Sequence, residues 1–137
     1  MISQYVESGQ VRFVFRHFPF IGEESMWAAE ASECAAEQGM FWEYHDQLFA
    51  ERQGENVGKF AKPNLKTIAD KVGLDPERFD PCIDSGRYEA SVEAEKEDGK
   101  SAGVISTPTV FINGELVKGL QPFEVYKQII DGYLKGE

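Results

Sequence analysis

Two cysteines, Cys34 and Cys82, are the residues of this chain whose side chains could carry thiol chemistry. They lie 48 positions apart, so the Cys-x-x-Cys spacing of dithiol redox motifs does not occur. A reactive cysteine needs a thiolate that is stabilised by a helix N-terminus or by a neighbouring cation. Cys34 instead stands among Glu30, Glu33 and Glu37, whose carboxylates disfavour a thiolate. Two interpretations stay open, namely a pair of buried, apolar cysteines or a disulfide across a helical block.

The two histidines, His17 and His45, could each act as a base or as a metal ligand. His45 follows Phe41 and Trp42 in an aromatic stripe, so we expect it to pack or to cap a helix. Two histidines and two distant cysteines do not form a zinc motif, which needs three or four ligands. Phosphate-binding glycine loops are also absent from the sequence. We therefore predict no metal and no cofactor.

The composition is typical of a folded, acidic domain. The chain has 137 residues, of which 42% are hydrophobic and 12% aromatic, and this length is typical of one domain. It carries 14 Lys and Arg against 24 Asp and Glu, and the net charge of −10 disfavours nucleic-acid binding. No apolar run approaches the ~20 residues of a membrane helix, and no signal peptide is visible after Met1. We expect neither nucleic acid nor membrane as a partner.

The first two-thirds of the chain predict one strand followed by helices. Residues 11–15 are β-branched, aromatic and basic, which favours a strand. Apolar residues at spacings of 3 and 4 predict a helix from residue 23 to about residue 38, and Gly39 ends it. Further helices are expected at residues 41–49, with core aromatics, at 65–72, from Asp75-Pro76 onward, and at 87–102 with a solvated surface. Residues 1–7 read as the end of a helix, and residues 53–64 as a loop.

The C-terminal part predicts a hairpin and a last helix. Thr109–Ile112 and Glu115–Lys118 are strand-like, and Asn113-Gly114 between them is the strongest short-range hairpin signal, because both turn positions need a positive φ. A final helix opens after Gln121-Pro122. The lone strand at residues 11–15 must pair, and the hairpin is the one available partner. We therefore predict a mixed α/β sheet covered by helices.

Four stretches of the chain occur in the order in which a known family has them. They are Val-Arg-Phe-Val-Phe-Arg-His-Phe-Pro at 11–19, Ala-Ala-Glu-Ala-Ser-Glu-Cys-Ala at 28–35 with Gly-Met-Phe-Trp-Glu-Tyr-His-Asp at 39–46, Asp-Pro-Cys-Ile-Asp-Ser-Gly at 80–86, and Gly-Val-Ile-Ser-Thr-Pro-Thr-Val-Phe-Ile-Asn-Gly at 103–114. Together they resemble the DsbA family of thioredoxin-fold disulfide oxidoreductases.

This resemblance implies an α/β, thioredoxin-like fold of the DsbA type that lacks its first strand. It implies a single domain over residues 1–137, with a helical insertion at about residues 23–102. In the family, the proline that corresponds to Pro108 is cis, and its loop holds an extended substrate segment by backbone hydrogen bonds. Thr107 and Pro108 are therefore the expected substrate-binding residues. Relatives often carry cysteines at both positions 34 and 82, which implies that Cys34 and Cys82 are close enough for a disulfide.

The chain departs from the family at its start, because the first strand and the Cys-x-x-Cys motif have no counterpart in residues 1–137. We interpret the chain as an N-terminally truncated family member. Exchange requires an attacking thiolate and a resolving partner, so thiol–disulfide oxidoreductase activity on protein or peptide substrates is expected to be weak or absent. One alternative is a non-catalytic, chaperone-like module that binds peptides at the cis-proline groove. Another is a protein resembling the glutathione-dependent isomerases.

The missing first strand also predicts an incomplete sheet. In the family this strand separates the second strand from the hairpin, so its absence leaves backbone groups that must find partners. The two halves could close up, or a strand of another chain could pair with the open edges. We favour a homodimer through exposed strand edges or strand exchange. The family implies a periplasmic or other extracytoplasmic location, although the chain shows no export signal.

Overall fold

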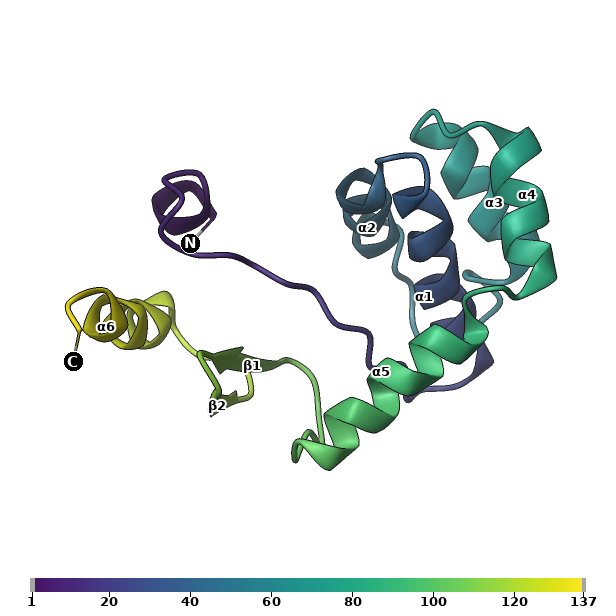
Figure 1. The fold of residues 1–137 in the computed structure, drawn as a ribbon. Coiled ribbons are helices and arrows are strands. Elements are labelled where there is room, and N and C mark those ends of the chain that lie inside the picture. The colour runs from purple at the N-terminus through teal and green to yellow at the C-terminus, as the bar shows by residue number, and fades with distance from the viewer. Residues whose placement is uncertain (1, 137) are drawn as a thin grey trace. The chain divides into compact units, whose positions relative to one another are not determined.

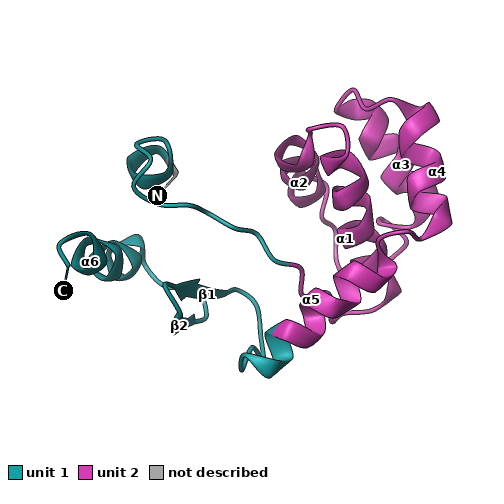
Figure 2. Cartoon of the chain, in the orientation of Figure 1, with its two compact units in different colours: residues 1–16, 99–137 teal, residues 17–98 magenta. Residues whose placement is uncertain are grey.

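The chain divides into two compact units, and the computed structural model describes residues 2–136. One unit comprises residues 17–98, and the other comprises residues 1–16 and 99–137 (Figure 2). The elements are η1 (Ile2–Val6, a π-helix), α1 (Glu23–Ala36), α2 (Phe41–Ala50), α3 (Lys62–Lys71), α4 (Pro76–Ser85), α5 (Glu89–Ser101), β1 (Thr109–Ile112), β2 (Glu115–Lys118) and α6 (Phe123–Leu134).

The unit of residues 17–98 is a helical bundle built around α1. This helix packs against α2, α3 and α4 (Figure 1). The Tyr44 hydroxyl is buried among them and donates a hydrogen bond to the Leu65 carbonyl at 2.9 Å; burial raises the pKa of this phenol. The buried cluster comprises Ala31, Cys34, Ala35, Tyr44, Leu65, Ile68, Ala69, Leu74, Phe79, Cys82 and Ile83.

The helix boundaries of this unit follow local signals in the sequence. Gly39 has a φ of 72° after α1, and the Asp75 carboxylate accepts a hydrogen bond from the Glu77 N–H at 3.0 Å at the start of α4. Both boundaries confirm the prediction. The loop predicted at residues 53–64 is shorter, because α3 begins at Lys62. Pro63 lies in the first turn of α3. A backbone N–H at this position would have no acceptor within the helix, so its absence in proline costs no helical hydrogen bond.

The prediction that the aromatic residues of α2 belong to the core is wrong for two of them. Tyr44 is fully buried, but the Trp42 and Phe49 residues are 43% and 62% exposed. The apolar residues of this ten-residue helix cover more than one face, and a single face meets the bundle. Outside the core, the His45 ring lies 5.3 Å from the Trp42 ring and 4.8 Å from the Phe49 ring, centroid to centroid.

The other unit contains a β-hairpin and α6, as predicted. In the hairpin Thr109 pairs with Lys118 and Ile112 with Glu115, and the strands are antiparallel. Asn113 and Gly114 have φ values of 48° and 88°, which the tight turn requires. In the same unit the η1 segment is joined to α6, because the Tyr5 hydroxyl donates a hydrogen bond to the Asp131 carboxylate at 2.6 Å.

The predicted strand at residues 11–15 is not formed, so the predicted mixed sheet is corrected to a two-stranded sheet of β1 and β2 within residues 2–136. The segment carries no regular secondary structure (Figure 1), and Val14 in it is 58% exposed. A strand needs a neighbour to satisfy its backbone. Within residues 2–136 the sheet contains β1 and β2 alone, so it has no third strand that could pair with residues 11–15.

Glu51, at the end of α2, provides a test of the bundle's electrostatics. Its carboxylate accepts hydrogen bonds from Lys71 at 2.6 Å and from Gln47 at 2.8 Å, and Lys59 lies 3.4 Å away. The Lys71 contact leads the causes that lower the pKa of Glu51 to about 2. A lowered pKa stabilises the fold above the ordinary value of 4.5, and this contribution is lost as the pH falls from 4.5 toward 2.

We therefore expect Glu51→Gln to lower the free energy of unfolding by about 1–2 kcal/mol at pH 7. The difference from the wild type should shrink steadily in urea titrations at pH 7, 4.5 and 3. Glu43→Gln, which changes an exposed carboxylate on the same helix, is the matched control and should stay near the wild type. A loss of equal size at all three pH values would contradict the assignment.

Candidate redox pair and substrate-binding loop

Cys34 and Cys82 form a disulfide between α1 and α4, with their Cα atoms 5.9 Å apart. Each cysteine lies in the last turn of its helix, and both belong to the buried cluster with residue exposures of 1%. Helical periodicity puts them there, since Phe79, Cys82 and Ile83 share one buried face of α4. Of the two interpretations that the sequence left open, the structure therefore has the disulfide and not two unpaired thiols.

The surroundings of this disulfide favour a structural cross-link over exchange chemistry. The sulfur atoms lie in the core, where an attacking thiolate cannot approach them without local opening. They also lie near helix C-termini, whose negative dipole end disfavours a thiolate on reduction. Active thiols in contrast are partly exposed and lie at helix N-termini or beside cations.

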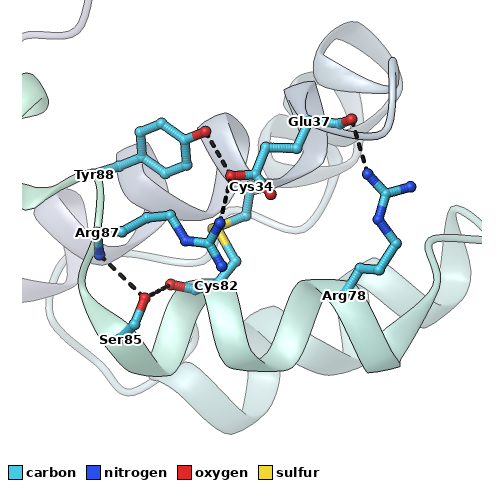
Figure 3. A network of polar contacts seen from close by, with 7 residues as sticks. All are labelled: Cys34, Glu37, Arg78, Cys82, Ser85, Arg87 and Tyr88. Carbon is cyan, nitrogen blue, oxygen red and sulfur yellow. Dashed lines mark hydrogen bonds and ion pairs between the residues drawn. A yellow bond between two sulfur atoms is a disulfide. The ribbon is translucent and has the colours of Figure 1, made fainter.

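A polar network lies next to the disulfide, at the ends of the same two helices (Figure 3). The Glu37 carboxylate accepts hydrogen bonds from Arg87 Nη1 at 3.1 Å and from the Tyr88 hydroxyl at 2.6 Å. The bond to Glu37 is the leading cause that raises the pKa of Tyr88. Arg78 Nη2 donates to the Glu37 carbonyl at 3.2 Å. The sequence showed no motif for this network, because its members come together only when α1 and α4 pack.

The two histidines have packing roles. The His17 residue is 6% exposed, its Nε2 lies 2.6 Å from a Glu33 carboxylate oxygen, and its backbone N–H donates to the Glu95 carboxylate. His45 Nδ1 lies 3.0 Å from the Asp46 carboxylate, between aromatic rings, which confirms the expected packing. Within residues 2–136, no group of three or more His, Cys, Asp or Glu side chains could hold a metal ion.

Thr107 and Pro108 lie in the loop that leads into β1, and the peptide bond between them is cis. Both residues are exposed, and the Thr109 hydroxyl closes the loop by donating to the Ser106 carbonyl at 2.6 Å. This loop belongs to the unit that does not contain the cysteines. The structure thus brings Cys34 and Cys82 together, and it places the expected substrate-binding residues in a separate unit.

Two exposed apolar residues flank this loop and were not among the predicted site residues. Ile105 precedes it and is 80% exposed, and Leu120 is 83% exposed. Leu120 comes two residues after the end of β2. Because Thr109 pairs with Lys118, the segment before β1 and the segment after β2 both lie at the open end of the hairpin. The only signal in the sequence was an apolar residue in each connecting segment, which by itself does not identify a site.

None of the helices in the described part of the chain is long and apolar enough to span a membrane.

Comparisons with known proteins agree with the fold and with the motifs. The family model described as Thioredoxin matches residues 1–132, and the chain therefore belongs to the thioredoxin family. It is 27% identical to disulfide bond formation protein D of Bacillus subtilis over 139 residues, which cover 98% of this chain and 62% of that protein. It is also 34% identical over 111 residues to Na(+)/H(+) antiporter NhaA 3 of Salinispora tropica, covering 80% of this chain and 16% of the antiporter.

The crystal structure of oxidised BdbD from Bacillus subtilis has the same fold. It matches with a TM-score of 0.87 and 24% identity, over 98% of this chain and 74% of BdbD. These findings confirm the thioredoxin-like fold with a helical insertion and the resemblance to DsbA-like oxidoreductases. The chain spans 62% of the length of the Bacillus relative that it matches in sequence.

Replacing both cysteines should measure what the cross-link contributes. In the chain-entropy view, closing a loop of 48 residues stabilises the fold by about 4 kcal/mol. We expect the free energy of unfolding of Cys34→Ser/Cys82→Ser to fall by roughly this amount in urea titrations followed by circular dichroism. Dithiothreitol should destabilise the wild type alone, because the double variant has no disulfide. If the reductant destabilises neither protein, the cross-link contributes nothing.

Proposed function

We propose that this chain is a member of the thiol–disulfide oxidoreductases of the DsbA type that binds extended protein or peptide segments at the Thr107–Pro108 loop. Its own thiol–disulfide exchange is weak or absent within residues 1–137. The observation that carries the proposal is a contrast between two sites, an exposed loop with apolar flanks and a buried disulfide.

We further propose that residues 1–137 act as one domain, with a helical insertion at about residues 23–102.

The loop has the features that recognition of an extended segment requires. Residues 105–108 are exposed, so backbone groups of Ile105 and Thr107 can pair with a peptide in the manner of an added strand, while the Ser106 carbonyl already accepts from the Thr109 hydroxyl. Ile105 and Leu120 offer apolar contacts at the same end of the hairpin. Unfolded substrates expose apolar side chains, so such contacts favour them over folded proteins.

The weak exchange activity follows from the position of the cysteines. Turnover requires a thiolate that attacks a substrate disulfide and a second thiol that resolves the mixed disulfide. The Cys34–Cys82 pair is buried near helix C-termini. Peptide binding at the loop requires neither Cys34 nor Cys82, so the geometry favours a non-catalytic, peptide-binding role.

Leu120→Asp tests the binding site. Because it introduces a charge at a residue that is 83% exposed, it should leave the fold intact and weaken binding of a fluorescein-labelled, unfolded, cysteine-containing peptide about tenfold in fluorescence anisotropy. Val57→Asp is the matched control, since Val57 is 64% exposed in the helical unit. Equal affinities of the two variants would refute the loop as the binding site.

The same proteins test the predicted lack of turnover. Reduction of insulin by dithiothreitol should proceed at the same rate with the wild type and with Cys34→Ser/Cys82→Ser. Acceleration by the wild type alone would show that the buried pair exchanges with substrates, and this part of the proposal would be wrong.

We also propose a homodimer that pairs through strand edges. The specific observation is that β1 is paired along one edge within the described residues, and the sequence of residues 11–15 favours a strand. Residues 11–15 of a second copy could add a strand to the second edge of β1. The net charge of −10 opposes association, so the oligomeric state should be measured near physiological salt, where charges are screened over about 8 Å.

Val14→Pro removes a backbone N–H from this segment, so it should convert the dimer into a monomer in sedimentation velocity. Val14→Thr keeps the donor and the β-branched shape, so this variant should remain dimeric. A monomeric wild type, or a dimer that survives the proline, would refute this association.

A further inference from the structure

Three side chains form a polar clamp beside the disulfide, namely Glu37, Arg87 and Tyr88 (Figure 3). Glu37 caps the C-terminus of α1, three positions after Cys34. Its side chain is 24% exposed, and the Tyr88 ring packs against the buried cluster. The Arg87 side chain is 50% exposed, so the clamp lies at the surface and water screens its ion pair. Its Tyr88 end is anchored by packing, and both bonds to the Glu37 carboxylate are charge-assisted.

The clamp is connected to the second cysteine through the backbone that follows α4. The Ser85 hydroxyl donates to the Cys82 carbonyl at 2.9 Å and accepts from the Arg87 N–H at 3.3 Å. Gly86 has a left-handed φ of 64°, which turns the chain out of α4 before Arg87. The disulfide therefore joins α1 to α4, and Glu37 joins the end of α1 to Arg87 and Tyr88, which follow α4.

We propose that Glu37 is a positioning residue that keeps Cys34 and Cys82 in register after reduction and so favours re-formation of the structural disulfide. While the disulfide is intact, the clamp adds little to the separation of the sulfurs, because the bond already fixes it. Once the bond is broken, the clamp still restrains the two helix ends, in addition to the packing of α1 against α4. It thereby raises the effective concentration of one thiol at the other and favours re-formation of the disulfide. This inference does not rest on peptide binding at the loop.

The exchange step can be written with dithiothreitol as the dithiol. One of its thiolates attacks a protein sulfur, the Cys34–Cys82 bond breaks, and a mixed disulfide forms. The second reagent thiolate attacks this mixed disulfide and closes the cyclic, oxidised reagent. Two electrons pass from the reagent to the protein, and the protein sulfurs take up two protons to become thiols. The reverse sequence re-forms the disulfide, and this direction is the one that the clamp favours.

The test is the redox equilibrium of the pair in graded mixtures of reduced and oxidised dithiothreitol, with thiols counted by alkylation and mass spectrometry. Glu37→Ala should shift the equilibrium about tenfold toward the dithiol, which raises the midpoint potential by about 30 mV. Tyr88→Phe keeps the ring and removes one donor, so it should shift the equilibrium about threefold in the same direction. If Glu37→Ala does not fold, Tyr88→Phe carries the test.

Asp84→Asn is the matched control. Asp84 also lies near the end of α4, but its carboxylate pairs with Lys66 of α3 at 2.8 Å and takes no part in the clamp. The equilibrium of this variant should stay at the wild-type value. Unchanged equilibria in both clamp variants would overturn the proposal. A shift of Asp84→Asn as large as that of Glu37→Ala would also overturn it, because loosening of α4 in general would then explain the effect.

Discussion

The helical unit depends on one constraint, which is the covalent link between the last turns of α1 and α4. α1 is the helix that α2, α3 and α4 all contact, so fixing α4 to it closes the bundle. A helical unit of this size has a small core, and a cross-link reduces the conformational freedom of its unfolded chain. Both cysteines belong to the buried cluster, so the link joins the two helices within their packed interface.

The same burial separates stability from function in this chain. Cysteines that belong to the buried cluster are protected from solvent, and they are equally protected from a substrate thiolate. Recognition of an extended peptide needs the opposite condition, namely exposed backbone with apolar side chains beside it. The Thr107–Pro108 loop meets this condition in the other unit. The stabilising disulfide and the proposed binding surface therefore belong to different units of the chain.

The sequence predicted best those features that short-range physics decides. The Asp75 cap, the Gly39 stop and the Asn113-Gly114 turn each depend on a few neighbouring residues, and the structure has all three. The strand at residues 11–15 was predicted wrongly because a strand exists only beside another strand, and propensity contains no information about a distant partner. The disulfide stayed open for the same reason, since 48 residues separate its cysteines.

The acidic residues around Cys34 show how a charge pattern acquires different roles once helices pack. Glu33 binds His17, and Glu37 holds Arg87 and Tyr88. Glu30 is 4% exposed, and burial, followed by the nearby Glu89 carboxylate, raises its pKa. On the sequence alone, these three carboxylates only argued against a thiolate. In the structure two of them bind segments that lie outside α1, so part of the chain's large negative charge is used to assemble the helical unit around its central helix.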